Sequence, residues 1–193
     1  MEKPDPSPLP TPESSERDYL TNPLQPKLEE GEDPSTYTRC ITFLSQNNIP
    51  FRTYSHKAVK TSKEAAEERG VPLDSGAKAL LVKYATKETA LKFALLVMSA
   101  GRKVNWKDVK NLLGSKNVVF ATLDEVKSVA GCIPGAVPPF GSVFGVPTLL
   151  DPSLQAQGDT INFNCGLRSH TVTMKTQDYV EAEKPKISPF TTE

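Results

Sequence analysis

Two strongly apolar runs in the middle of the chain constrain its fold more than any other feature. The first is Gly76-Ala-Lys-Ala-Leu-Leu-Val-Lys-Tyr84 and the second is Leu91-Lys-Phe-Ala-Leu-Leu-Val-Met-Ser99. Both have the length of a β-strand and are apolar at consecutive positions, which predicts strands that are buried on both faces. The polar segment 85–90 between them predicts a turn. The two runs are therefore expected to form a buried β-hairpin.

Shorter elements are expected on either side of this hairpin. Helices are predicted from residue 35 or 36 to 46 and over 62–69, 105–113, 123–130 and 177–182, and strands over 49–56, 117–121, 146–151, 160–164 and 171–175. The candidate helix N-caps are Ser35 or Thr36, Thr61 or Ser62, and Thr122. Strands and helices are intermixed without a regular βαβ rhythm. The predicted fold class is therefore α+β, a mixed α/β arrangement with a curved mixed sheet and helices around it.

Composition divides the chain into three parts. Residues 1–36 hold nine acidic and three basic side chains, a net charge of −6, with proline at positions 4, 6, 8, 10 and 12. Such a segment cannot bury enough apolar area to offset the entropy of ordering, so it is expected to be disordered. Residues 37–182 form the predicted domain and 183–193 a C-terminal tail, with 20 basic and 14 acidic side chains between them, a net charge of +6. A mildly basic body fits either a polyanionic partner or ordinary solvated lysines.

The sequence also bears on the compartment. No apolar run approaches the roughly 20 residues of a membrane span, so no membrane partner is expected. The N-terminus, Met-Glu-Lys-Pro-Asp-Pro, lacks the apolar segment of a secretory signal. Cys40, Cys132 and Cys165 are odd in number and widely spaced, which favours a reduced cytosolic or nuclear setting over a disulfide framework. The predicted location is cytoplasmic.

A stiff loop is predicted where glycine and proline recur over 131–151. Its first part reads Gly131-Cys-Ile-Pro-Gly-Ala-Val-Pro-Pro-Phe-Gly141. Glycine permits backbone conformations and close approaches that other residues do not, whereas proline fixes φ and removes a donor. Such a loop is either a structural turn or the wall of a site, and the pattern alone leaves both interpretations open.

Few side chains stand out as candidates for chemistry. Lys78 interrupts the first apolar run, so its ammonium either reaches water past a packed stem or meets a ligand in a cleft. His170, between a glycine-containing turn and a strand, is either a structural hydrogen-bonding residue or a functional one, and His56 is a weaker candidate. The histidines and cysteines lack metal-ligand spacing, so no metal is expected. Lys103, Lys107 and Lys110 fall on one predicted helix face, which contacts either solvent or phosphates.

Three stretches, in this order, resemble the YbaK-type editing domains associated with prolyl-tRNA synthetase. Gly76-Ala-Lys-Ala-Leu-Leu-Val resembles their lysine strand, 131–141 resembles their glycine-rich pocket loop, and 146–151 with 162–166 resembles the strands that follow. The resemblance covers about 37–182. It implies a curved, barrel-like mixed sheet surrounded by helices. It also implies a trans-editing hydrolase that deacylates mischarged aminoacyl-tRNA, such as tRNA(Pro) charged with Ala, Cys or Ser.

The resemblance further implies a site. Lys78 matches the functional lysine of the family, and Gly135 matches the glycine whose backbone lies by the substrate ester. The amides of Gly135 and Ala136 are then expected to stabilise the oxyanion. The remaining expected pocket residues are Gly131 as a conformational element of the loop, Val137, Pro138, Pro139 and Phe140 as walls that set acyl size, and His170 as a polar residue.

Partners follow from the same resemblance. The acceptor end of aminoacyl-tRNA is the expected substrate, and prolyl-tRNA synthetase or another translation factor is a candidate partner. Neither a cofactor nor DNA is expected. The alternative is a non-catalytic module that binds tRNA or a synthetase, which the acidic, proline-rich segment 1–36 suggests.

Overall fold

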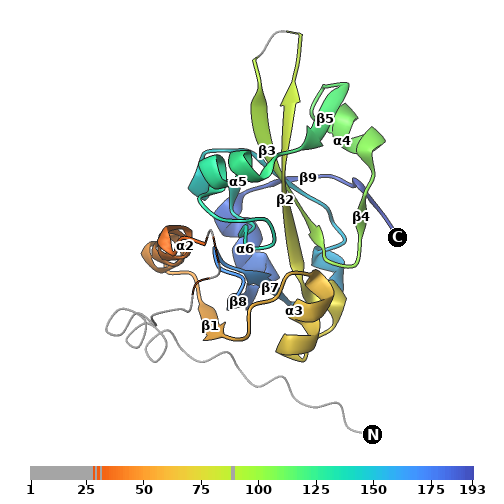
Figure 1. Cartoon of the computed structure of the whole chain (residues 1–193). Helices are drawn as coiled ribbons and strands as arrows, with labels where there is room; N and C mark the ends of the chain where they lie inside the picture. Colours follow the sequence, from red (N-terminus) through yellow and green to blue (C-terminus); the bar gives the residue numbers. More distant parts are fainter. Residues whose placement is uncertain (1–27, 29, 31, 88–89) are drawn as a thin grey trace, which may run out of the picture.

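A mixed five-stranded sheet forms the centre of the protein, as the computed structural model shows for residues 28, 30, 32–87 and 90–193 (Figure 1). The strand order is β5-β2-β3-β6-β9. The strands are β2 (Ala77–Ala85), β3 (Lys92–Ser99), β5 (Asn117–Phe120), β6 (Thr148–Leu150) and β9 (Lys186–Ile187). β2 pairs antiparallel with β3 and β5, whereas β3 pairs with β6, and β6 with β9, in parallel. The predicted hairpin is confirmed.

Both faces of β3 are buried, which explains its unbroken apolar sequence. Leu95 and Val97 pack into one core, and Leu96 and Met98 pack into a second core on the opposite face. Successive side chains of a strand point to opposite faces, so a strand between two cores must be apolar at every position. Helix α5 (Leu123–Ala130) contributes to the first core and α4 (Trp106–Leu112) to the second.

A second, antiparallel sheet lies beside the lower end of β2 in Figure 1. Its strand order is β1-β8-β7, with β1 (Phe51–Ser55), β8 (His170–Lys175) and β7 (Thr160–Asn164). One backbone bridge, between Gly76 and Asn162, connects it to the start of β2. The mixed α/β fold with helices around curved sheets agrees with the predicted class.

The helix starts test the predicted caps. Thr61 accepts a hydrogen bond from the Glu64 N–H at the start of α3 (Ser62–Arg69), and Thr122 forms a capping box with Glu125 at the start of α5. The helix predicted from residue 35 or 36 to 46 is found as α2 (Ser35–Gln46), but its predicted cap is wrong: the N-cap is Pro34, and the Asp33 carboxylate accepts from the first helical N–H at 2.8 Å. Short 3₁₀ turns occur at Leu73–Ser75, Gly141–Phe144 and Gln155–Gln157.

Residues 183–193, the expected C-terminal tail, pack onto the body. After α6 (Thr176–Glu183), strand β9 joins the central sheet and β10 (Thr191–Thr192) pairs with β4 (Lys103–Val104). Phe190 between them is fully buried, and its N–H donates to Asp151 at 2.7 Å. Most of the predicted disordered segment 1–36 lies outside the described residues. Within the described part of the chain, no helix is long and apolar enough to cross a membrane.

Candidate functional site

A cavity of about 310 Å³ lies where the two sheets meet. Its walls come from α3, the start of β2, the loop at 134–137, and β7. The residues that line it are Lys60, Thr61, Ser62, Ala65, Ala66, Arg69, Val71, Pro72, Leu73, Gly76, Ala77, Lys78, Ala79, Leu80, Ala100, Gly135, Val137, Asn162, Phe163 and Asn164. The lysine strand and the glycine-rich loop, 57 positions apart at Lys78 and Gly135, therefore meet at one cavity.

Lys78 is held at the cavity by backbone groups. Its Nζ donates to the carbonyl of Ala100 at 3.1 Å and to the carbonyl of Arg102 in the β3–β4 turn. Burial lowers the pKa of Lys78 from its ordinary value. An ammonium has three N–H donors, and two of them are used by these carbonyls. The third is left for a ligand in the cavity.

The loop at Gly135 has an unusual backbone that needs glycine. Gly135 has φ +87°, in the left-handed region that side-chain-bearing residues rarely adopt. Its carbonyl accepts from Asn164 Nδ2 at 2.8 Å, and its N–H makes no hydrogen bond to any described residue. Ala136 differs from the expectation, since its N–H already donates to the carbonyl of Ile133 at 3.0 Å. Of the two expected amide donors, only that of Gly135 is available to a ligand.

Arg69 is a cavity residue that sequence reasoning did not single out. Its Nε donates to Thr171 Oγ1 at 2.8 Å, and its Nη2 donates to Asn164 Oδ1 at 2.5 Å. Burial lowers its pKa, against a smaller opposing effect of Tyr54. No carboxylate among the described residues pairs with this guanidinium. Ala65 and Ala66, four and three positions earlier, are buried, so helical spacing could have placed Arg69 on the inner face.

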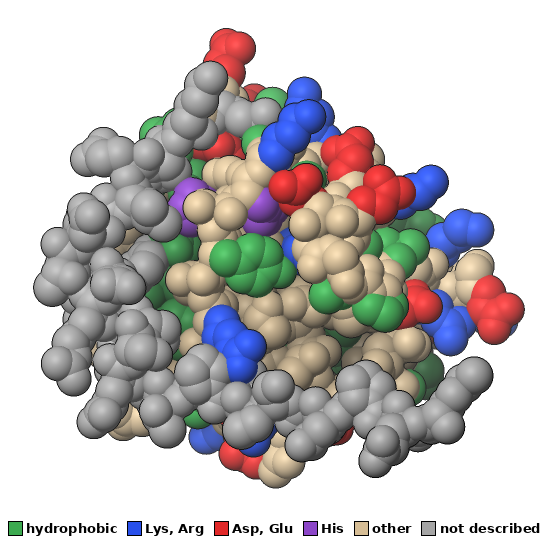
Figure 2. Space-filling view, turned by 90° about the horizontal axis from the view of Figure 1, so that it is seen from below, with side chains coloured by type: hydrophobic (Ala, Val, Ile, Leu, Met, Phe, Trp, Pro, Cys, Tyr) green, Lys and Arg blue, Asp and Glu red, His purple; other side chains and the backbone are tan. Residues whose placement is uncertain are grey.

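The cavity lining holds positively charged side chains and no acidic one. Lys60, Arg69 and Lys78 are among its lining residues, which include no Asp or Glu. Acidic and basic side chains lie together along the upper and right-hand edge of the face seen from below (Figure 2). A positively charged, partly desolvated cavity favours an anionic ligand or a group that gains negative charge during a reaction.

Several predicted pocket residues lie behind the cavity rather than on its surface. Val137 lines it, but Phe140 is fully buried in the core, where its ring contacts the rings of Phe43, Phe163 and Tyr179. Phe140 supports the wall indirectly, because Phe163 lines the cavity. Pro138 and Pro139 are also buried and are not lining residues, and the Pro139 carbonyl accepts from Tyr179 Oη.

Gly131 also lies away from the cavity. It ends α5 in the left-handed conformation, with φ +66°. A Cβ at this position would lie 2.7 Å from Thr36 Oγ1. Gly131 therefore ends the helix and allows the close approach of α2 to α5, and it is not among the residues that line the cavity.

The structure does not bring the histidines to the cavity lining. His170 is 2% exposed, its Nδ1 lies 3.0 Å from Ser169 Oγ, and its ring meets that of Tyr37 edge-on at 4.8 Å. Its pKa is lowered by burial and, to a lesser degree, by His56. His56 Nε2 lies 2.8 Å from Thr171 Oγ1, the hydroxyl that also accepts from Arg69. The histidine with an indirect link to the cavity is therefore His56.

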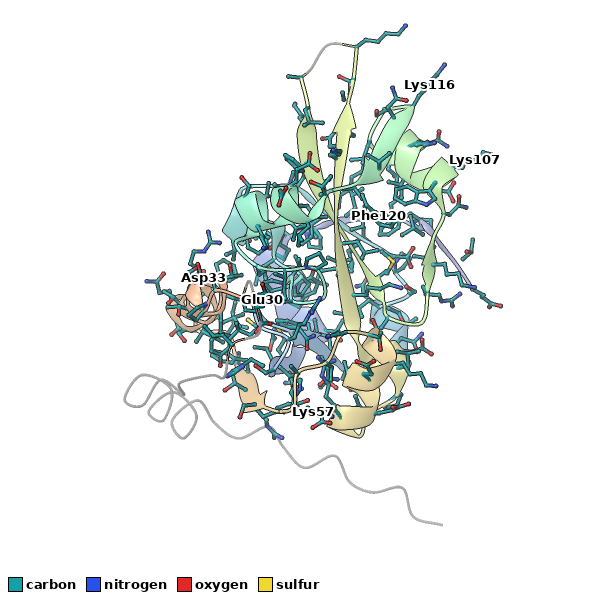
Figure 3. The ribbon with its side chains drawn as sticks, viewed as in Figure 1. Glu30, Asp33, Lys57, Lys107, Lys116 and Phe120 are labelled. Atoms are coloured by element: carbon teal, nitrogen blue, oxygen red, sulfur yellow. The ribbon has the colours of Figure 1, made fainter. Side chains whose placement is uncertain are left out.

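Two further groups of candidate residues lie apart from the cavity. Cys40, Cys132 and Cys165 are free and buried, and burial raises the pKa of Cys132 to about 12. Within the described ranges, no group of three His, Cys, Asp or Glu side chains is arranged to hold a metal. Lys103 belongs to β4, not to the predicted helix. Lys107 lies near one end of the molecule, whereas Lys57, three positions before the cavity residue Lys60, lies near the other (Figure 3).

Comparison with known proteins gives one family. The sequence profile of the aminoacyl-tRNA editing domain matches residues 56–182. The chain is 32% identical over 155 residues to the multifunctional Ser/Thr-tRNA deacylase ProXp-y of Escherichia coli K12, and the match covers 80% of this chain and 92% of that protein. The O157:H7 strain has a counterpart with the same identity.

Solved structures share the fold at lower identity. A proposed trans-editing enzyme for prolyl-tRNA synthetase superposes with a TM-score of 0.71 at 19% identity, covering 82% of this chain and 98% of its own. A protein from work on epitope backbone grafting onto scaffold proteins superposes with a TM-score of 0.72 at 18% identity, covering the same shares. At these identities the likeness concerns the fold alone.

Proposed function

The chain belongs to the aminoacyl-tRNA editing domain family, and we propose that its cavity hydrolyses the ester of mischarged aminoacyl-tRNA in trans. The observation that carries this proposal is the meeting of the Lys78 ammonium and the free Gly135 N–H at one positively charged cavity. An aminoacyl ester is already activated, so hydrolysis needs a positioned carbonyl and a stabilised oxyanion more than a strong protein nucleophile.

In the proposed reaction a water molecule adds to the ester carbonyl. The carbonyl oxygen gains negative charge and accepts a hydrogen bond from the Gly135 N–H. The bond to the ribose oxygen then breaks, this oxygen takes up the proton that the attacking water has lost, and the products are the free amino acid and uncharged tRNA. One amide donor of this kind contributes about 3–4 kcal/mol of transition-state stabilisation in a well-studied protease.

The cations of the cavity are proposed to hold the acceptor end of the tRNA. Lys78 has one N–H left beyond its two carbonyl partners, and the Arg69 guanidinium has no carboxylate partner among the described residues. A phosphodiester near these groups supplies negative charge, and an ester carbonyl accepts a hydrogen bond from them. Lys60 adds a third positive charge to the lining.

We propose serine and threonine as the first acyl groups to test, with alanine and cysteine beside them. The E. coli relative is a Ser/Thr-tRNA deacylase, and it shares 32% of its aligned residues with this chain. The cavity offers hydroxyl and amide groups, including Thr61, Ser62 and Asn164, beside the apolar side chains of Val137 and Phe163. Its volume of about 310 Å³ is at the small end of the range for ligand pockets.

The test is a deacylation panel with the full chain. Purified tRNA(Pro) carrying Ser, Thr, Ala, Cys or Pro, and tRNA(Ser) and tRNA(Thr) carrying their own amino acids, are incubated with the wild type and with Lys78→Met. Release of at least one mischarged acyl group from tRNA(Pro), with Pro spared and Lys78→Met impaired, supports the proposal. A wild type that releases no acyl group faster than the buffer control refutes it.

A further inference from the structure

The glycine loop is held by hydrogen bonds to three consecutive carbonyl groups. Arg168 donates to the Pro134 carbonyl through Nη2 at 2.8 Å and Nε at 3.2 Å. Asn164 donates to the Gly135 carbonyl at 2.8 Å, and the N–H of Gly166 donates to the Ala136 carbonyl at 2.7 Å. These donors therefore fix the peptide planes on both sides of Gly135.

The contact of Arg168 has a directional consequence for Gly135. The Pro134 carbonyl and the Gly135 N–H belong to one peptide group, which is trans, so the two bonds point in opposite directions. Arg168 binds the carbonyl but does not line the cavity, whereas Gly135 does. Because the Arg168 guanidinium binds the carbonyl side of this peptide group, the Gly135 N–H points away from Arg168. It also polarises the peptide group, which strengthens the N–H as a donor.

We propose that Arg168 is a positioning residue, which holds the peptide group between Pro134 and Gly135 so that the Gly135 N–H is presented to the substrate oxyanion. The inference rests on the proposed deacylase function. Asn164 fixes the next peptide group, and Arg69 orients Asn164 through its Oδ1. Arg168 itself touches neither substrate nor reacting atoms in this arrangement.

The test separates positioning from folding and from substrate binding. Single-turnover deacylation, with enzyme in excess over the best mischarged tRNA of the panel, gives a maximal rate and a half-saturating enzyme concentration. Arg168→Gln is expected to lower the maximal rate about 10- to 100-fold, because the amide donor is worth about 100- to 1,000-fold when lost entirely. Half-saturation should stay within about twofold, since phosphate contacts fix binding. Arg168→Lys should retain part of the rate, because it keeps one charged donor.

Arg39→Gln is the matched control. Arg39 also donates through Nη2 to a backbone carbonyl, that of Ala130 at 3.4 Å, before the loop begins and outside the cavity. The maximal rate of Arg39→Gln should remain within about twofold of the wild-type rate, because this contact lies away from the reacting atoms. If Arg168→Gln melts early, Arg168→Ala with added ethylguanidinium replaces it, and recovery of the rate is expected.

Three outcomes overturn the inference. They are an unchanged maximal rate in Arg168→Gln with an active wild type, an effect on half-saturation alone, and an equal loss of rate in Arg39→Gln. Each leaves the deacylase function standing. An inert wild type instead refutes the deacylase function and the positioning role together.

Discussion

Replacing Gly135 by alanine tests the proposed oxyanion donor against backbone strain. Gly135 and Gly145 have similar left-handed conformations, with φ +87° and +70°, but only Gly135 lines the cavity. A Cβ at Gly135 would lie 3.5 Å from Arg168 Nε and Lys60 O, which are ordinary contacts, and a Cβ at Gly145 would meet nothing within 4 Å. Both Gly135→Ala and Gly145→Ala therefore introduce strain without a steric clash.

The magnitude follows from the backbone. A left-handed L-residue costs about 1–2 kcal/mol, which for a chain of this size lowers the melting temperature by about 2–8 °C. Since domains have about 5–15 kcal/mol of stability, both variants remain folded at 25 °C. Only Gly135→Ala should lose activity, by about tenfold or more, because relaxing φ displaces an N–H that acts on the transition state.

The assay pairs thermal unfolding with single-turnover deacylation of the same preparations. Similar melting temperatures with a rate loss confined to Gly135→Ala support the argument. Equal loss of rate in both variants would assign the effect to stability. Full activity in Gly135→Ala would remove the loop amide from the mechanism.

Two further predictions concern charge. Lys78→Met should lower kcat/KM about 10- to 100-fold through loss of one charged hydrogen bond to substrate, and an unchanged kcat/KM contradicts this. Because burial lowers the pKa of Lys78, wild-type activity should decline, as pH rises, at a lower pH than the ordinary lysine pKa would give. Glu183 is buried and accepts from Ser142 and Thr148, so Glu183→Ala should lose about 2–5 kcal/mol in urea unfolding. Burial raises the pKa of Glu183, so the pH-dependent part of its contribution to stability is fully present below the ordinary glutamate pKa and is lost as pH rises through the folded value. Glu183→Gln should flatten that part of the pH profile, and an unchanged slope would refute the assignment.

The sequence predicted the central hairpin well because its signal is local. An unbroken apolar run of strand length requires two covered faces, and β3 has a core on each. Thr122 was identified as a cap for the same reason, since its partner Glu125 lies three positions away. The start of α2 was predicted to within one residue, but its cap was not, because the acceptor comes from Asp33 instead of from Ser35 or Thr36.

The cavity was harder to predict because its residues come together only in the tertiary structure. The loop sequence showed that 131–141 is stiff, but not that Val137 faces the cavity while Phe140 faces the core. Arg168 was passed over because its partner is a backbone carbonyl 34 positions away, which leaves no trace in side-chain spacing. The resemblance brought Lys78 and Gly135 forward, and the structure places both on one cavity.

The bridge between Gly76 and Asn162 has a consequence for how the dimensions of the cavity are set. Both residues line the cavity; Gly76 directly precedes β2 of the central sheet and Asn162 belongs to β7 of the second sheet, so the cavity lies where the two sheets join. A slight rotation of one sheet against the other would widen or narrow the cavity while every lining residue stayed the same. If the cavity holds the acyl group as proposed, substitutions in the two cores that pack against these sheets would alter amino-acid preference without changing any lining residue.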